Sequence, residues 1–411
     1  MTAPDMSRHN RIFACSSVAL DYFAFLVDSL ASTTAAVVPV TAVTEDAYRG
    51  ASRDSRLTKA LLRLRMYVVY PLLLVAATFR ARRGDTFVVT SNTFFAPAMV
   101  ALLVGWRGIQ VVHLLYDLYP DAIEVAGRMQ TGGIASRLVG VVTRLSQHQS
   151  TGTVYLGDFL RDYAERRWGE TRRPGVIPIA TDVRLYEAAP QQPPSFSPLV
   201  LHYGGQLGLM HDADALLESL LLLARDGALG TTVTFDGLLS GSRAAAFEAA
   251  LRGTPGVFVG GTLPSDAWRR HVERAHVGVV TLSPGGATVC LPSKTYAMMA
   301  AGLAIIAICP AWSDLARLVE DCGAGWVINN SPFQRPLAEG NYVSACRVRR
   351  PTAEVAADFR DTVLRLVGEP LQVEQRRQNA RVAICSRFSP EQIAEQWASY
   401  LRSLPSGSGQ G

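Results

Sequence analysis

The chain has 411 residues, 48% of them hydrophobic and 18% charged, which is typical of a globular protein and too long for one ordinary core. Two domains of roughly 200 residues are therefore expected. A net charge of +5 does not indicate a nucleic-acid partner, and no zinc-finger or RNA-binding signature occurs. Six scattered cysteines without a C-x-x-C spacing predict reduced core thiols and a cytoplasmic protein.

The first half of the sequence alternates patterns that are typical of strands and helices. Strands are predicted at 12–16, 35–43, 86–90, 109–114, 153–156 and 175–179. Helices are predicted at 56–79 with a break at Pro71, at 96–104, at 134–145, and from 158 onward. This alternation predicts a doubly wound α/β domain.

A basic and apolar segment stands out in this half. Between residues 49 and 83, nine basic residues occur against one acid, Asp54, and they flank a hydrophobic run at 67–79. That run is shorter than the roughly 20 residues that a bilayer-spanning helix needs. We expect residues 49–83 to contact an anionic membrane surface as an interfacial helix. A helix packed on the sheet, with its arginines in water, is the alternative.

A proline-rich stretch at 188–198 marks a linker, after which the alternation resumes. Strands are predicted at 199–202, 232–235, 257–259, 277–282 and 325–328, and helices at 212–224, 242–251, 265–275, 352–367, 372–386 and 390–404. The expected domains are therefore 1–190 and 191–388, followed by a final helix at 389–405 and a tail at 406–411 that is disordered by composition.

The stretch 279–308 is predicted to form a strand, a glycine loop, a helix and a second strand. In such a unit the loop at the carboxyl end of the first strand is where ligands bind. Ser293 is predicted to cap the helix. The amides of Lys294, Thr295 and Tyr296 would then point out of the helix start, where the dipole favours a phosphate or diphosphate.

Lys294 strengthens this prediction because the chain contains only one other lysine, Lys59, and uses arginine elsewhere. A compact ammonium beside a helix start suits a diphosphate. A solvated lysine in an ordinary βαβ unit is the alternative.

A second glycine loop, 203–208, follows the first strand of the second domain and contains Gly204 and Gly205. Its spacing does not fit the dinucleotide fingerprint, which argues against NAD. Because both glycine loops follow strands of one domain, they are expected to face one crevice. Asp212 and Asp214 are expected to support the next helix start, and no metal site is expected.

Seven segments in a specific order resemble bacterial glycosyltransferase family 4, especially enzymes that add sugars to lipid-linked polysaccharide precursors. Four segments of this chain resemble the donor half of that family: LHYGGQLGLMHDADALLESL, VFVGGTLPSDAW, LPSKTYAMMAAGLAIIA and DCGAGWVI. Three segments of this chain resemble the acceptor half of that family: FVVTSNTFFAPAMVALLV, IQVVHLLYDLYPDAIEVAG and GVIPIATDVRLYEAA. The resemblance implies the GT-B fold, in which two Rossmann-like doubly wound α/β domains face each other across a cleft and the last helix returns to the first domain.

The resemblance also implies an activity. It points to the transfer of a hexosyl or N-acetylhexosaminyl group from a nucleotide-diphosphate sugar to a lipid-linked or glycan acceptor in polysaccharide biosynthesis, with retention of configuration. Neither a cofactor nor a metal is expected. Peripheral attachment to the inner face of the plasma membrane agrees with the basic segment 49–83.

Site residues follow from the same resemblance, position by position. The donor-binding residues would be Gly204, Gly205, Gln206, Phe258, Val259, Gly260, Ser293, Lys294, Thr295 and Tyr296. Asp117 would act with Lys294 in catalysis and face the sugar or the acceptor hydroxyl. His113 would be its neighbour on the acceptor side.

The chain also departs from the family pattern. Many members carry two glutamates eight positions apart, where this chain has Val289 and Ala297, and the usual Arg and Lys pair of the first donor loop is replaced by Gln206 and His211. Ala297 favours a second reading, a catalytically inactive subunit that binds a nucleotide-sugar or a partner transferase. A nucleotide-sugar 2-epimerase is the third reading, and it needs a cluster of acids and histidines that is not recognisable in the second domain.

Overall fold

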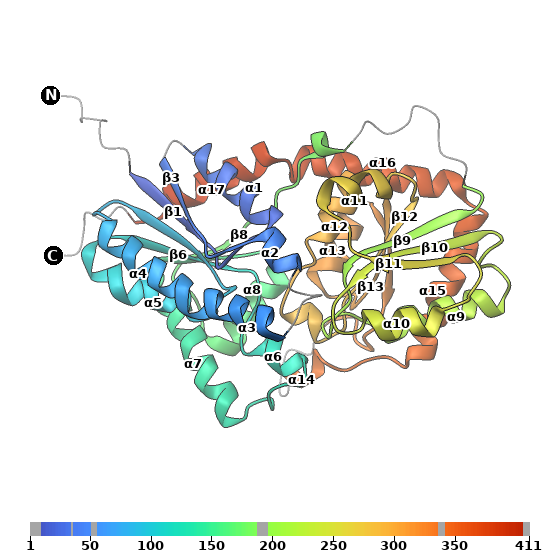
Figure 1. Cartoon of the computed structure of the whole chain (residues 1–411), viewed down its shortest axis with the longest axis horizontal. Coiled ribbons are helices and arrows are strands. Elements are labelled where there is room, and N and C mark those ends of the chain that lie inside the picture. Colours follow the sequence, from blue (N-terminus) through green and yellow to red (C-terminus); the bar gives the residue numbers. More distant parts are fainter. Residues whose placement is uncertain (1–9, 34–35, 51–55, 187–195, 336–341, 406–411) are drawn as a thin grey trace. The chain divides into compact units, whose positions relative to one another are not determined.

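The structure is a computed structural model, and it describes residues 10–33, 36–50, 56–186, 196–335 and 342–405. The chain forms two compact units, an N-terminal unit of Met1–Ala180 with Pro390–Gly411 and a C-terminal unit of Thr181–Ser389 (Figure 1). The tail expected at 406–411 lies outside the described residues.

The N-terminal unit is built on a six-stranded parallel sheet with the order β3-β1-β5-β6-β7-β8. Its strands are β1 Arg11–Cys15, β3 Ala36–Val40, β5 Thr86–Thr90, β6 Gln110–Leu115, β7 Gly152–Tyr155 and β8 Pro174–Val176, and a separate pair consists of β2 Val18–Ala19 and β4 Val43–Thr44. Its helices are α1 Asp21–Ala31, α2 Glu45–Gly50, α3 Arg56–Leu64, η1 Arg65–Val69, α4 Tyr70–Arg80, α5 Ala96–Val104, η2 Gly105–Arg107, α6 Asp121–Val125, α7 Ile134–Gln149, α8 Asp158–Trp168 and α17 Pro390–Ser403.

The core of this unit lies between the sheet and helices α4 and α5. Phe13 of β1 stacks on Phe87 of β5 with ring centres 4.6 Å apart, and Tyr70 and Leu74 of α4 pack into the same cluster. The inner strands β1, β5, β6 and β7 are buried on both faces, which explains their largely hydrophobic sequences. Elsewhere in the unit, α17 packs against α1.

The long helical segment of this unit differs from its prediction. No break occurs at Pro71, because α3, the π-helical turn η1 and α4 follow one another directly, and Pro71 is in the first turn of α4. A proline removes one N–H and crowds the preceding turn, and the wider π-helical turn accommodates both effects. The continuous helical segment Leu57–Arg80 is long and apolar enough to cross a membrane by length and composition. The hydrophobic run 67–79 taken alone therefore underestimated the length of the apolar helix.

The C-terminal unit contains a second six-stranded parallel sheet with the order β11-β10-β9-β12-β13-β14. Its strands are β9 Leu199–Gln206, β10 Val233–Ser240, β11 Val257–Gly261, β12 Val277–Thr281, β13 Ala304–Cys309 and β14 Gly325–Asn329. Its helices are η3 Val183–Leu185, α9 Ala213–Arg225, α10 Ala244–Leu251, α11 Ser265–Val272, η4 Gly286–Thr288, α12 Lys294–Ala300, α13 Asp314–Asp321, α14 Tyr342–Ala345, α15 Thr352–Val367 and α16 Pro370–Arg387.

Several helices were not predicted, among them α1 and α13. Both are short, and α13 follows β13 after only a few residues. Its start carried a readable signal, since Ser313 is followed by Asp314 and the Ser313 hydroxyl accepts a hydrogen bond from the Ala316 amide at 3.1 Å. Short elements like these give little periodicity to read.

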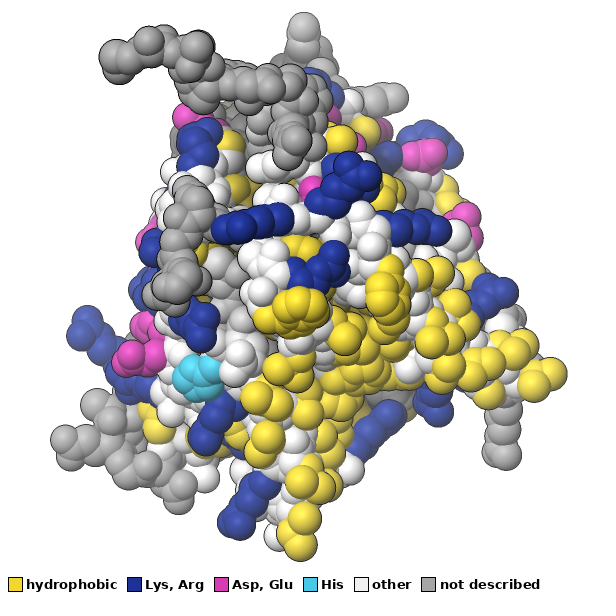
Figure 2. Space-filling model, turned by 90° about the vertical axis from the view of Figure 1, so that its left-hand side faces the viewer, with side chains coloured by type: hydrophobic (Ala, Val, Ile, Leu, Met, Phe, Trp, Pro, Cys, Tyr) yellow, Lys and Arg dark blue, Asp and Glu magenta, His cyan; other side chains and the backbone are white. Residues whose placement is uncertain are grey.

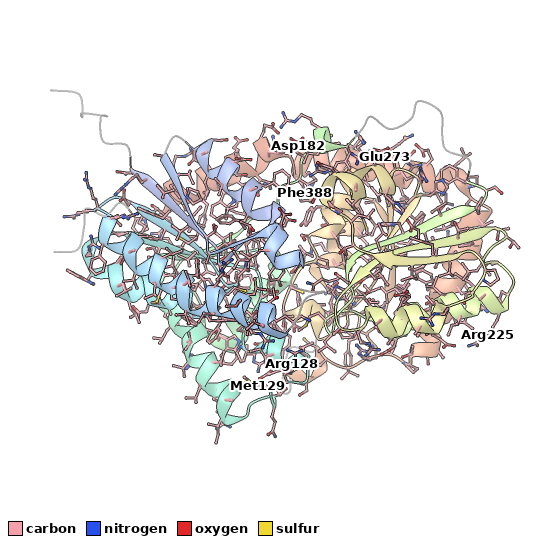
Figure 3. The ribbon with its side chains drawn as sticks, in the orientation of Figure 1. Arg128, Met129, Asp182, Arg225, Glu273 and Phe388 are labelled. Carbon is pink, nitrogen blue, oxygen red and sulfur yellow. The ribbon has the colours of Figure 1, made fainter. Side chains whose placement is uncertain are left out.

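The two units divide at Thr181, ten residues before the expected boundary. The Thr181 amide donates to the carbonyl of Phe388 at 2.9 Å, and the Asp182 side chain caps η3; Figure 3 labels Asp182 and Phe388. The Tyr186 ring lies edge-on to Trp268 of α11, with centres 6.4 Å apart. Residues 181–186 therefore pack with the C-terminal unit, and most of the predicted linker lies outside the described residues.

Candidate functional site

The two glycine-containing segments of the C-terminal unit lie side by side, as expected for one crevice. The Ser283 amide, just after β12, donates to the Met210 carbonyl at 2.8 Å. A Cβ atom on Gly286 would approach that same carbonyl oxygen to 2.1 Å, so only glycine fits there. The carboxyl ends of β9 and β12 are thus joined by direct contact.

Gly204 and Gly205 are strand residues and do not form a loop, which corrects the prediction. Strand β9 continues through Gln206 and pairs with β10 over its full length. A Cβ atom on Gly204 would lie 2.8 Å from the Trp268 indole nitrogen, and Gly205 has a φ of +92°. These two glycines allow close packing and a left-handed backbone at the end of a strand.

Lys294 is a partly buried cation that pairs with no carboxylate among the described residues. Its Nζ lies 3.7 Å from the centre of the Tyr203 ring and donates to the Gln206 carbonyl at 3.2 Å. In the described part of the chain no carboxylate pairs with it. Burial therefore lowers the pKa of Lys294 well below its usual value. A bound anion would stabilise the ammonium form, which makes this position a candidate anion site.

His211 offers a second donor beside Lys294. Its Nδ1 accepts a hydrogen bond from the Gly208 amide at 3.1 Å, so the proton of the neutral ring resides on Nε2. Burial, together with the charge of Lys294, lowers the pKa of His211 to about 3. At neutral pH the ring is therefore uncharged and carries one N–H. The sequence placed His211 near the donor loop but gave it no role.

Helix α12 starts differently from the prediction. Ser293 occupies the N-cap position, but its side chain makes no capping hydrogen bond. The Thr295 and Tyr296 amides donate to the carbonyls of Pro292 and Ser293, at 3.1 and 3.2 Å. Of the three amides expected to face an anion, only that of Lys294 is left. The helix is seven residues long, so the anion site depends on side chains more than on a dipole.

The side chains next to Lys294 point into the unit. Thr295 is fully buried, and its Oγ1 has no hydrogen-bond partner among the described residues. The Tyr296 ring packs edge-on against Phe388, with centres 5.2 Å apart. A ligand in front of α12 would therefore meet Lys294 and the backbone, with the Tyr296 ring held in the core.

The predicted nucleobase segment forms the edge strand β11. Phe258 is 56% exposed, while Val259 packs against the core of the sheet. Gly260 pairs with Leu238 of β10. Alternation along the strand thus leaves the Phe258 ring as a free aromatic surface that could stack on a flat ring.

A cluster of acidic and imidazole side chains occurs in the C-terminal unit, so the expectation that this domain lacks one is wrong. The Trp268 indole donates to His202 Nε2 at 3.1 Å, which leaves the ring proton on Nδ1, 3.1 Å from Asp236 Oδ2. His271 Nε2 lies 2.5 Å from the same oxygen. The members come from β9, β10 and α11, so distant parts of the sequence had to fold together to form it.

This cluster is built from hydrogen bonds. Burial opposes ionisation of Asp236, but the hydrogen bonds from His202 and His271 outweigh it and hold its pKa below the usual value. The three side chains could geometrically surround a metal ion. However, Trp268 holds His202 in the tautomer whose Nδ1 carries a proton, and a metal ligand at that atom must be deprotonated. The cluster therefore ties α11 to the sheet directly beneath Gly204.

The acidic residues after the first glycine segment support helix α9. The Asp212 carboxylate accepts from the Ala215 amide at 3.4 Å and from the Asn330 side chain at 2.6 Å. Asp214 forms an ion pair with Arg243. The predicted role of Asp212 as a helix cap is confirmed.

In the N-terminal unit, Asp117 and His113 border one small hollow with Ser91. The Ser91 hydroxyl accepts from the amides of Tyr116 and Asp117, both at 3.0 Å, and so fixes the backbone just after β6. Burial raises the pKa of Asp117 to about 6. It lowers the pKa of His113 to about 3, and neither ring nitrogen of His113 has a hydrogen-bond partner among the described residues. These unsatisfied groups make the hollow a candidate binding site.

Replacing His113 with leucine should leave the free energy of unfolding unchanged or raise it by about 1 kcal/mol, because no hydrogen bond is lost and two buried polar atoms are removed. Urea denaturation measures this. The matched control is His276→Leu, since His276 is also buried but its Nδ1 accepts from the Val200 amide at 2.9 Å. That variant should lose about 1–3 kcal/mol. A comparable loss for His113→Leu would show that His113 has a partner in the native protein.

Replacing Asp117 with asparagine should raise the melting temperature at pH 7.5 and leave it unchanged at pH 4. The pKa of Asp117 is about 6 in the folded protein against 3.8 ordinarily, so its charge destabilises the fold above pH 6, and the effect disappears as the pH falls below 4. With allowance for partial exposure the gain is about 1–2 kcal/mol. Asp162→Asn, at a 52% exposed carboxylate of α8, is the control. If Asp117→Asn and the wild type have equal melting temperatures at pH 7.5, the inference that Asp117 is a buried charge is contradicted.

A buried ionic network supports the segment after Asp117. Asp121 and Glu124 of α6 both pair with Arg167 of α8, and Glu124 lies 2.8 Å from the guanidinium. Asp121 also accepts from Tyr163 at 2.7 Å and from the Trp168 indole at 2.9 Å. Burial raises the pKa of Asp121 in spite of these partners. The sequence analysis assigned a role only to Asp117 of the segment YDLYPD, and it did not predict this ionic network.

No family model matches the sequence. A probable glycosyltransferase of Pseudomonas aeruginosa, WbjE, is 24% identical over 274 residues, which are 64% of this chain and 66% of that protein. Anabaena Alr3699/HepE in complex with UDP superposes with a TM-score of 0.65 at 14% identity, covering 97% of this chain and 100% of that chain. A sucrose-phosphate synthase from Thermosynechococcus elongatus gives a TM-score of 0.66 at 15% identity, with coverages of 96% and 99%. HepE has also been solved with UDP-glucose, with a TM-score of 0.63 at 14% identity.

These similarities establish the fold, and the match to WbjE spans just under two thirds of that protein. Both units contain parallel six-stranded sheets with Rossmann-like order, and the structural matches extend over nearly the whole chain. The α/β fold class expected from the sequence, GT-B, is confirmed.

Proposed function

We propose that the protein is a glycosyltransferase that uses a nucleoside-diphosphate sugar as donor. The observation that carries this proposal is Lys294, a partly buried ammonium that pairs with no carboxylate in the described part of the chain and lies where the two glycine-containing segments meet. The names of the similar proteins support it, because one is a probable glycosyltransferase and another was solved with UDP and with UDP-glucose. UDP is therefore the first nucleotide to test.

The chemistry follows from charge. When the sugar leaves, negative charge develops on the diphosphate, and preorganised donors aimed at that charge lower the barrier. The Lys294 ammonium and the His211 Nε2–H are such donors, and no metal is required in this scheme. Gly204, Gly205 and Gln206 would admit the diphosphate, while Phe258 and its neighbours would receive the nucleobase.

On the acceptor side we assign Asp117 as the catalytic carboxylate and His113 as its neighbour. Turnover should fall as the pH drops below about 6, where Asp117 becomes protonated. The transferred group is proposed to be a hexosyl or N-acetylhexosaminyl unit, transferred with retention of configuration. The acceptor is proposed to be a lipid-linked or glycan precursor in polysaccharide biosynthesis. The protein would work in the cytoplasm, on the inner face of the plasma membrane, with residues 49–83 in contact with anionic lipid.

The residue at position 297 favours a second candidate function, that of a catalytically inactive subunit that binds a nucleotide-sugar. Ala297 of α12 and the buried Val289 stand where many family 4 enzymes carry glutamates, so a sugar or ribose contact would be missing. Donor binding without release of nucleoside diphosphate in the presence of acceptor membranes would favour this subunit. The 2-epimerase reading would be favoured by conversion of the donor sugar in the absence of any acceptor.

The experiment that tests the proposal is a thermal-shift series with UDP, GDP, dTDP and CMP. A ligand at one hundred times its dissociation constant adds about 2.7 kcal/mol to the free energy of unfolding. We expect UDP to stabilise the wild type and the Lys59→Ala control, and not Lys294→Ala. Lys59 is an exposed residue of α3 and the only other lysine. If no nucleotide stabilises the wild type, the donor-site proposal fails.

A further inference from the structure

The N-terminal unit has a broad hydrophobic surface that the sequence indicated only in part. Three of its most exposed hydrophobic side chains are Phe79 of α4 (81%), Trp106 of η2 (82%) and Ile134 of α7 (80%). Figure 2 shows hydrophobic side chains extending across the side of this unit where α4, α5 and α7 lie, with lysines and arginines around them. Helix α4 packs on α5, and α5 packs on α7. The surface therefore extends well past residues 49–83.

The long helix of this surface lies along the unit and is not free to cross a bilayer. Tyr70, Leu74 and Ala77 are buried in the core of the parallel sheet domain. Leu72 and Phe79, on other sides of the same helix, are 63% and 81% exposed. A helix with one face fixed in a folded core exposes only its opposite face, so contact with lipid must be parallel to the membrane.

The excess of basic side chains indicates what this surface would bind. Segments α3, η1, α4, α5, η2 and α7 contain no Asp or Glu, although they carry Lys and Arg residues. Among the described residues, Lys59, Arg63, Arg65 and Arg80 pair with no carboxylate. Unpaired cations around an apolar surface complement anionic headgroups above acyl chains.

Arg107 of η2 connects two helical segments of this surface by hydrogen bonds. Arg107 donates to the carbonyls of Thr78 and Ala81, each at 2.6 Å, and so joins the end of α4 to the segment after α5. This brings the exposed Trp106 to the same end of the unit as Phe79. Indole rings are favoured at membrane–water interfaces, where an apolar ring meets headgroups.

We propose that α3–η1–α4, α5–η2 and α7 form one docking platform for an anionic lipid bilayer, with Trp106 and Leu138 as anchors outside the basic segment. The platform extends the proposed function, since a lipid-linked acceptor requires contact with a membrane, but its evidence is independent of the donor site. Leu138 of α7 is 66% exposed.

The test is co-sedimentation with vesicles of phosphatidylglycerol and phosphatidylcholine in equal amounts, compared with vesicles of phosphatidylcholine alone. The double variant Trp106→Ser/Leu138→Ser, which leaves 49–83 intact, should bind the anionic vesicles at least about ten-fold more weakly than the wild type. The matched control is Leu371→Ser/Val382→Ser, because these α16 side chains are 85% and 64% exposed but lie in the other unit. The control should bind like the wild type.

Wild-type binding by the Trp106/Leu138 variant would overturn the platform, and equal binding to both kinds of vesicle would overturn its anionic preference. If the double variant instead changes the elution volume in gel filtration without changing vesicle binding, the surface is a contact between copies of the chain. UDP-dependent stabilisation is measured on the same preparations. Lost vesicle binding with retained UDP stabilisation supports the platform, and lost UDP stabilisation with retained vesicle binding counts against the donor site alone.

Discussion

Replacing Lys294 with alanine is expected to lower turnover by about 100-fold, which is typical for the loss of one preorganised electrostatic contact at a developing charge. Lys294 is suited to this role because its ammonium is held over the Tyr203 ring and by the Gln206 carbonyl, with no carboxylate to neutralise it in the described part of the chain. The effect should fall on kcat and on kcat/KM alike if the contact forms mainly in the transition state.

The measurement is the rate of UDP release from a UDP-sugar in the presence of acceptor membranes. Lys59→Ala serves as the control for the loss of a lysine, and all variants are assayed with acceptor membranes dissolved in detergent, so that membrane binding plays no part. Lys294→Arg should not restore activity, because the larger planar group does not fit the space of a compact ammonium. Turnover of Lys294→Ala within about two-fold of the wild type would remove Lys294 from the site.

Removing Arg167 is expected to have the largest effect on stability. Arg167→Leu leaves Asp121 and Glu124 buried without their cation, and breaking a buried ion pair in this way costs about 3–5 kcal/mol. For a unit of about 200 residues this lowers the melting temperature by roughly 6–20 °C. The control is Arg161→Leu on the same helix, whose partners Asp158 and Asp162 are exposed, so the loss should stay below about 1 kcal/mol.

The Arg167→Leu variant should also show a characteristic pH dependence. Without the guanidinium, burial keeps the pKa of Asp121 above its usual value, so the destabilisation is present at neutral pH and is relieved as the pH falls and the carboxyls become protonated. Urea denaturation at pH 7.5 and pH 5 measures this difference. A variant that is as stable as Arg161→Leu at pH 7.5 would show that the network contributes little. UDP stabilisation should persist, since the network lies in the other unit.

Strands were easier to predict than the ends of elements. A continuous hydrophobic sequence such as 86–90 is what a strand buried on both faces requires, so the parallel sheets could be inferred from local pattern alone. Pro71 misled the prediction because its effect depends on the preceding π-helical turn, which has no local signature. Gly204 and Gly205 were placed in a loop because glycine usually marks one, whereas Trp268 requires glycine inside the strand.

The candidate site was predictable to the extent that its parts are contiguous in sequence. Lys294 stood out because lysine is rare in this chain, and the glycine segments stood out because they follow strands. The cluster of His202, Asp236 and His271 could not be read from the sequence, since three separate elements bring it together. The surface formed by α5 and α7 was missed for a related reason, because exposure depends on which face of each helix the sheet covers.

The two α/β domains, the order of their strands and longer helices, and the kinds of residue at the ends of the strands can be inferred from the amino-acid sequence alone. Hydrophobic period and turn chemistry are local properties, and they suffice for those inferences. Which charged side chains are left without partners depends on the folded structure. Lys294 is a candidate anion site, and Arg167 a structural cation, because of the neighbours that folding places around each of them, and no local sequence pattern records those neighbours.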